Sequence, residues 1–251
     1  MMERERRPKV LAVLHQAHST PGRVGCYLHA LGAELDIRRP SLDEPLPATL
    51  DNHDGVIVFG GPMGANDECD WIGREIRWLE TPLREDKPLL CICLGAQMLA
   101  KTLGARVYTY PDRRGELGYF PIAPEPIADD LCAAPFPRHV YQWHFDGFDL
   151  PKSSRLLASG AADFPAQAFS HGDKAVALQF HPEVTYEMMC RWTTKGHDRL
   201  ACPGAQPRQQ HLDGWRRHDA PVAKWSRTFL RRWLAGALGA AAAPLRKMVA
   251  A

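Results

Sequence analysis

The sequence has little of what marks an exported, membrane-spanning or metal-binding protein. Its apolar stretches at residues 10–14 and 234–245 are shorter than the ~20 residues that a spanning helix requires. The seven cysteines are scattered and form no CxxC pair, so we expect reduced thiols rather than disulfides or a structural metal site. These absences predict a cytoplasmic protein that binds no metal ion and no membrane.

Nucleotide-binding loops are also missing. The sequence contains neither a GxGxxG segment nor a phosphate loop of the GxxxxGK[ST] type, so we expect no nucleotide cofactor, and no other cofactor is indicated. The net charge is only +2, although residues 186–251 hold 12 Lys/Arg against 4 Asp/Glu. A solvent-exposed helix face is the commoner reason for such a surplus, and we expect no nucleic-acid partner.

Short apolar runs alternate with segments of helical spacing. The runs at 9–14, 55–59 and 88–93 have no polar face, as expected of strands that are covered on both sides. Helical spacing follows at 70–79 and 94–104. This order predicts an α/β fold with an open, mostly parallel sheet and helices on both faces. Mixed or antiparallel strands are expected to extend the edge of that sheet, at residues 118–123, 139–143, 155–158, 166–170 and 175–180.

The chain shows no internal repeat and no second domain. We expect a single domain over residues 1–251, with a core at about 9–195 and a helical C-terminal extension at about 196–251. A Gly-, Pro- and Gln-rich interruption at 202–210 precedes a last helix that we expect at 221–238.

A candidate nucleophile lies where the third apolar run passes into a helix. Residues 91–95 read Cys-Ile-Cys-Leu-Gly, with Cys93 at the turn, Gly95 after it and Cys91 before it. A nucleophile on a sharp strand-to-helix turn requires small neighbours, because the turn is strained. The helix N-terminus favours a thiolate and an adjacent oxyanion. The spacing indicates a nucleophilic cysteine, with a buried structural cysteine as the alternative.

A second element, His181-Pro182-Glu183, follows another apolar run. Pro182 restricts His181 to extended backbone, in which side chains two residues apart project to the same side. Glu183 is therefore expected to reach the imidazole of His181. A cysteine paired with a histidine that a carboxylate orients is what thiol-dependent acyl transfer requires. The alternative is an ordinary strand end.

The third element is the glycine-rich loop at residues 60–64, Gly-Gly-Pro-Met-Gly. It follows a predicted strand, and open α/β sheets bind ligands at the carboxyl ends of their strands. A loop of this kind directs a backbone N–H at a developing oxyanion. An ordinary loop is the alternative.

Taken in order, these three segments resemble class I, triad-type glutamine amidotransferases. The similarity covers about residues 56–184 and is looser in the C-terminal helices. Segments 61–68 and 142–151 are most similar to stand-alone proteins that resemble the amidotransferase domain of GMP synthase. The resemblance implies a flavodoxin-like sheet and an enzyme that hydrolyses the side-chain amide of glutamine to glutamate and ammonia.

The resemblance also implies roles for individual residues. Cys93 would be the nucleophile, His181 the general base and acid, and Glu183 its orienting carboxylate. The oxyanion would be held by the backbone N–H groups of Gly61 and Leu94. The residues that it implies for substrate binding are Gln97, Gly60, Trp143, His144, Phe145 and Phe169. The family normally has Gly where this sequence has Cys91, which places a second thiol beside the expected nucleophile.

Two other functions stay open at this point. The same residues would serve a γ-glutamyl peptidase that cleaves γ-glutamyl peptides or conjugates, and a non-catalytic regulatory subunit could keep the same fold. The sequence also leaves open whether the ammonia passes to a synthetase subunit in trans and whether the chain forms a homodimer.

Overall fold

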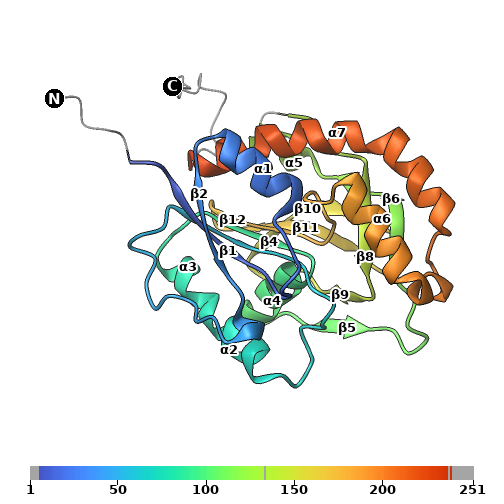
Figure 1. The fold of residues 1–251 in the computed structure, drawn as a ribbon, viewed down its shortest axis with the longest axis horizontal. Helices are drawn as coiled ribbons and strands as arrows, with labels where there is room; N and C mark the ends of the chain where they lie inside the picture. The colour runs from blue at the N-terminus through green and yellow to red at the C-terminus, as the bar shows by residue number, and fades with distance from the viewer. Residues whose placement is uncertain (1–5, 133, 237, 239–251) are drawn as a thin grey trace.

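The computed structural model describes residues 6–132, 134–236 and 238 (Figure 1). Its main sheet contains β1 (Lys9–Val13), β2 (Glu34–Arg38), β3 (Gly55–Val58), β4 (Leu89–Ile92), β7 (Ala123–Pro124), β10 (Ser154–Ser159), β11 (Ala166–His171) and β12 (Ala175–Leu178). The strands lie in the order β2-β1-β3-β4-β12-β11-β10-β7. Neighbours from β2 to β12 are parallel, and β11, β10 and β7 add an antiparallel edge. The predicted α/β class with its antiparallel extension is confirmed.

Helices cover both faces of this sheet (Figure 1). Helices α1 (Gly22–Ala30), α5 (Pro126–Cys132) and α7 (Arg208–Leu234) pack on one face, and α2 (Asp70–Trp78), α3 (Glu80–Arg84) and α4 (Leu94–Thr102) on the other. Strand β1 shows why its sequence is apolar throughout: Val10 and Ala12 contribute to the core under α1 and α7, whereas Leu11 and Val13 contribute to the core under α2 and α4. Successive side chains of a strand point to opposite faces, so a strand between two helical layers has no polar side.

Two strands that we expected at the edge of the sheet lie elsewhere. β6 (Glu116–Pro121) and β8 (His139–His144) pair with each other in a separate antiparallel ribbon. Tyr119 and Tyr141 of this ribbon form a small core of their own with Val184 and with helix α6 (Tyr186–Lys195). This packing, rather than a place in the main sheet, buries their apolar sides. A second short pair joins β5 (Val107–Thr109) to β9 (Asp146–Phe148).

The last helix begins earlier than the sequence suggested. Helix α7 begins at Arg208, directly after the predicted interruption, and continues through Pro221, which we had expected at its start. A proline inside a helix removes one backbone hydrogen bond. The first half of α7 is nevertheless held by packing, because Gly214 lies against the ring of Tyr119 and His211 is fully buried. The helix ends at Leu234, and the rest of the predicted extension, at residue 237 and residues 239–251, lies outside the described residues.

Two elements were not anticipated from the sequence, namely helix α1 and strand β2. The short 3-10 helices η1 (Pro40–Leu42) and η2 (His197–Ala201) complete the structure. Within the described part of the chain, no helix combines the length and the apolar character needed to cross a bilayer.

Candidate active site

The three predicted motifs meet at the carboxyl ends of three neighbouring strands. Strands β3, β4 and β12 lie side by side in the sheet. Gly60 follows β3, Cys93 follows β4 and His181 follows β12, although these residues are far apart in the sequence. Because the strands are parallel, the loops after them emerge at the same edge of the sheet, where open α/β folds bind ligands.

Cys93 has the strained backbone expected of a nucleophile on a strand-to-helix turn. Its φ of 51° and ψ of −107° lie in a region that side chains other than glycine rarely adopt. The turn depends on Gly95, since a Cβ at that position would lie 2.4 Å from the carbonyl oxygen of Val58. Helix α4 begins at Leu94, so the first N–H groups of the helix, which have no partner within it, lie next to the sulfur.

Cys91 does not disturb this turn. Its side chain is fully buried in the core under α2 and α4, whereas Cys93 belongs to the core on the other face of the sheet. Burial, followed by the nearby Glu75 carboxylate, raises the pKa of the Cys91 thiol well above its usual range. The second thiol is therefore neutral and points away from the site.

His181 and Glu183 form a buried pair beside Cys93. His181 Nδ1 donates to Glu183 Oε1 at 2.7 Å, and the two residues are 5% and 3% exposed. The other ring nitrogen, Nε2, is buried and makes no hydrogen bond to any described residue. Burial by itself lowers the pKa of His181, but the charges of Glu183 and Cys93 outweigh it and raise the pKa to about 10.

The glycine-rich loop fits between these groups. A Cβ on Gly60 would lie 2.9 Å from His181 Cε1 and 3.3 Å from Cys93 Cβ, so only a glycine lets the ring and the cysteine approach each other here. A Cβ on Gly61 would lie 3.1 Å from Leu94 Cδ2. The two backbone segments expected to hold the oxyanion are thus in contact.

A buried ion pair that the sequence reasoning missed lies behind this loop. His15, which lies just beyond β1, contacts Gly60 O through Nδ1 at 3.1 Å and Glu75 Oε1 through Nε2 at 3.0 Å. Both acceptors are oxygens without a proton to give, so both ring nitrogens donate and the ring is an imidazolium. Burial lowers its pKa, but Glu75 and Gly60 raise it further, and the net pKa is raised. The ring also stacks on Trp71, with 5.5 Å between centroids.

The contact with His15 fixes the orientation of the Gly60–Gly61 peptide. In a trans peptide the C=O of one residue and the N–H of the next point in opposite directions. Since the carbonyl of Gly60 points at His15, the N–H of Gly61 points to the opposite side. A histidine placed at the end of a buried apolar run was the signal for this group in the sequence.

Most of the predicted substrate-binding residues line a cavity of about 180 Å³ next to Cys93. Gln97, Trp143, His144 and Phe145 are among its lining residues. Phe169 is different: it lies in the core under α4, with its ring edge-to-face against Phe148, and it does not line this cavity.

A layer of buried polar side chains fixes the floor of this cavity. Gln97 donates through Nε2 to Asp146 O at 3.2 Å, and His144 Nδ1 contacts the same carbonyl at 3.0 Å. The other nitrogen of His144 contacts Glu116 Oε2 at 3.1 Å. Residues 6–132, 134–236 and 238 contain no group of three or more His, Cys, Asp or Glu side chains placed to hold a metal ion.

The comparison with known proteins gives the family of the chain. Residues 23–190 match the family model of glutamine amidotransferase class-I. The chain belongs to the class-I glutamine amidotransferase family. It is 28% identical over 190 residues to the glutamine amidotransferase-like protein YfeJ of Salmonella typhimurium, covering 71% of this chain and 77% of that protein. It is 30% identical over 167 residues to one subunit of the glutamine-hydrolysing GMP synthase of Thermoplasma volcanium, covering 65% and 78%.

Solved structures of amidotransferases share the fold. A glutamine amidotransferase from Thermotoga maritima superposes with a TM-score of 0.80 at 30% identity, covering 91% of this chain and 99% of that one. A glutamine amidotransferase from Methylobacillus flagellatus has a TM-score of 0.83 at 24% identity, covering 92% and 95%. The latter shows similarity of fold alone.

Proposed function

We propose that this amidotransferase hydrolyses the side-chain amide of glutamine through a γ-glutamyl thioester on Cys93. The observation that carries the proposal is the strained backbone of Cys93 directly beside the buried His181–Glu183 pair. Such strain persists only where the surrounding structure enforces it, and it gathers at functional sites.

The reaction uses each group in turn. The Cys93 thiolate attacks the amide carbon, and the N–H groups of Gly61 and Leu94 hold the oxyanion; a single donor of this kind contributes about 10²–10³ in rate. His181, oriented by Glu183, gives a proton to the leaving nitrogen and ammonia departs. Water then loses a proton to His181 and attacks the thioester, which releases glutamate and restores the thiolate.

Substituting the two neighbouring cysteines tests the proposal. We expect Cys93→Ala to abolish release of ammonia from glutamine while keeping the thermal unfolding midpoint of the wild type. Cys91→Ala is the matched control, since that thiol points into the opposite core, and it should keep turnover. Hydrolysis retained by folded Cys93→Ala would exclude the thioester.

A separate synthetase subunit is the proposed acceptor of the ammonia. The support is the name of the relatives from Thermoplasma, each of which is one subunit of a GMP synthase. Copurification of a synthetase with the chain from native extract tests this partner.

The alternative of a non-catalytic subunit makes a different prediction for Cys93. An enzyme of the proposed type reacts at Cys93 with a glutamine-like chloroketone at neutral pH, because the sulfur must be a thiolate to attack. A thiol that stays unmodified under these conditions would favour a binding role. The peptidase alternative is supported by a second cavity, described next.

A further inference from the structure

A second and larger cavity adjoins the site on the histidine side. Its volume is about 320 Å³, and Gly60, His181 and Glu183 are among its lining residues. It shares Gly61, Pro62, Trp143 and Arg199 with the cavity beside Cys93, so the two are continuous. The smaller cavity holds the glutamyl part in the proposed reaction, and the larger one lies where the leaving nitrogen receives its proton.

Ammonia does not account for a cavity of this size. A molecule as small as water takes a share of only about 30 Å³ in the liquid. The space beyond His181 is large enough for a leaving group of many atoms.

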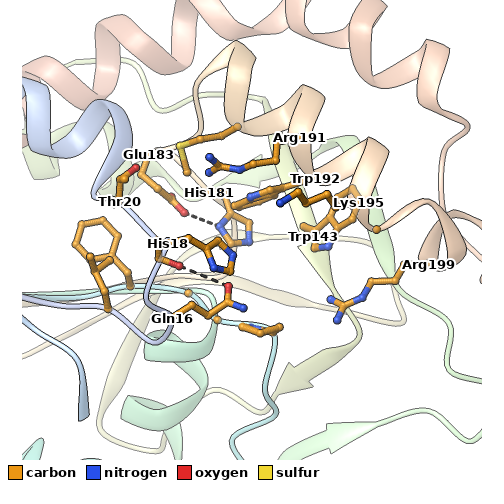
Figure 2. A pocket seen from close by; sticks show the side chains of 18 residues that line it. Gln16, His18, Thr20, Trp143, His181, Glu183, Arg191, Trp192, Lys195 and Arg199 are labelled. Carbon is orange, nitrogen blue, oxygen red and sulfur yellow. Dashed lines mark hydrogen bonds and ion pairs between the residues drawn. The ribbon is translucent and has the colours of Figure 1, made fainter. Parts of the chain in front are cut away.

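The wall of this cavity is cationic. Arg191, Lys195 and Arg199 line it from α6 and η2, spaced four residues apart along the chain, and Figure 2 shows them along the same side. Among the described residues none of the three forms an ion pair. The carboxylate among the lining residues, Glu183, is engaged by His181. These cations belong to the C-terminal charge surplus that the sequence showed, and nothing in the thioester chemistry uses them.

Aromatic surface lies between the cations and the histidine. Trp192 contacts the ring of His181, with 5.0 Å between centroids, and Trp143 lies 5.9 Å from Trp192. Both indoles line the cavity. An apolar leaving group can pack against these rings while a negative group on it reaches the cations.

We propose that this cavity binds the amine part of a γ-glutamyl conjugate whose amine part carries a carboxylate on an apolar or aromatic body. The inference rests on the proposed thioester chemistry and names its substrate class. Cys93 forms a bond to the γ-carbonyl carbon, the C–N bond breaks, and the electron pair of that bond stays on nitrogen. The nitrogen takes a proton from His181, so the free amine leaves through the larger cavity. Water then hydrolyses the thioester to glutamate.

Two chromogenic amides that differ by one carboxylate test this inference. They are γ-glutamyl-4-nitroanilide and γ-glutamyl-3-carboxy-4-nitroanilide, and the measured quantity is the ratio of their kcat/KM values. We expect the wild type to favour the carboxylated amide at least about tenfold, which corresponds to about 1.4 kcal/mol. The double variant Arg191→Gln/Lys195→Gln should bring the ratio close to one.

The control is Lys152→Gln, which removes one exposed cation that lines neither cavity. It should keep the ratio of the wild type. Any intrinsic difference in reactivity between the two anilides is common to all the proteins, so a change of ratio between them reports the cavity. A ratio near or below one in the wild type, or one that the double variant leaves unchanged, would overturn the inference.

Calorimetric binding of the released amine separates this inference from the reaction itself. The probe is 5-amino-2-nitrobenzoate, with 4-nitroaniline as the uncharged reference. We expect the wild type to bind the carboxylated probe at least about tenfold more tightly than the double variant does. If no amide is hydrolysed but this difference is found, the proposed function fails and the anion site stands. Equal binding by both proteins would remove the site.

Discussion

The contact between His15 and Gly60 O predicts that a residue outside both chemical motifs sets the rate of the reaction. The change we consider is the double variant His15→Leu/Glu75→Met. Removing one partner alone would leave the other charge buried, which costs about 3–5 kcal/mol, whereas replacing both by apolar side chains is often neutral. The double variant should therefore fold, but it has no donor for the Gly60 carbonyl.

The expected loss follows from what that donor holds in place. The Gly60–Gly61 peptide carries one of the two N–H groups proposed for the oxyanion, and loss of one such donor costs about 10²–10³ in kcat, or about 2.7–4 kcal/mol. We expect kcat to fall by up to that factor with little change in KM, because the oxyanion forms only along the reaction and not in the bound ground state.

Two rates measured on the same protein separate positioning from a general loss of structure. Iodoacetamide alkylates Cys93 by displacement at a CH₂ carbon and forms no oxyanion. The alkylation rate, followed at Cys93 by peptide mass mapping because Cys26 and Cys69 are also exposed, should keep the order of magnitude of the wild type. The control Glu75→Gln leaves a neutral His15 that still donates to Gly60 O, and it should retain most of kcat. Unchanged turnover in the folded double variant, or a parallel loss of alkylation, would refute the reasoning.

Three further predictions follow from the geometry of the site. Gly60→Ala should lower kcat by about 10²-fold, since its Cβ would lie 2.9 Å from His181 Cε1 and displace the ring. Gly95→Ala should lower the free energy of unfolding by about 1–3 kcal/mol, because its Cβ would lie 2.4 Å from a backbone oxygen that cannot turn aside. Stability should fall as the pH rises from about 6.5 to about 10, because His181 keeps a proton in the folded state that the unfolded chain has already lost.

Each of these has its own check. For Gly60→Ala, steady-state kinetics are compared with the unfolding midpoint, and equal losses in both would indicate a fold defect instead. For Gly95→Ala, urea unfolding gives the free energy directly, and a value equal to that of the wild type would contradict the close approach. For the pH dependence, urea unfolding of the wild type and of His181→Asn is measured across the range, and the variant should show the shallower decline. Parallel curves would rule out His181 as the group responsible.

Much of the fold was readable from the sequence because it depends on local patterns. Strands β1, β3 and β4 are apolar almost throughout, and that pattern is typical of strands in a sheet that helices cover on both faces. Helices α2 and α4 followed from spacing and from the glycine near the end of α4. The ribbon of β6 and β8 and the course of α7 through Pro221 did not follow, since both depend on packing against residues far away in the chain, such as Tyr119 against Gly214.

The sequence by itself determined which side chains this protein has for chemistry: a cysteine on a tight turn, a histidine two residues before a glutamate, and a glycine-rich loop. Only the tertiary structure decided that they meet, because the neighbourhood of β3, β4 and β12 is set by the order of strands in the sheet. The same holds for His15 against Gly60 and for the cations that line the larger cavity together with the loop after β1. Such contacts join distant segments, and no local pattern of residues encodes the distance between them.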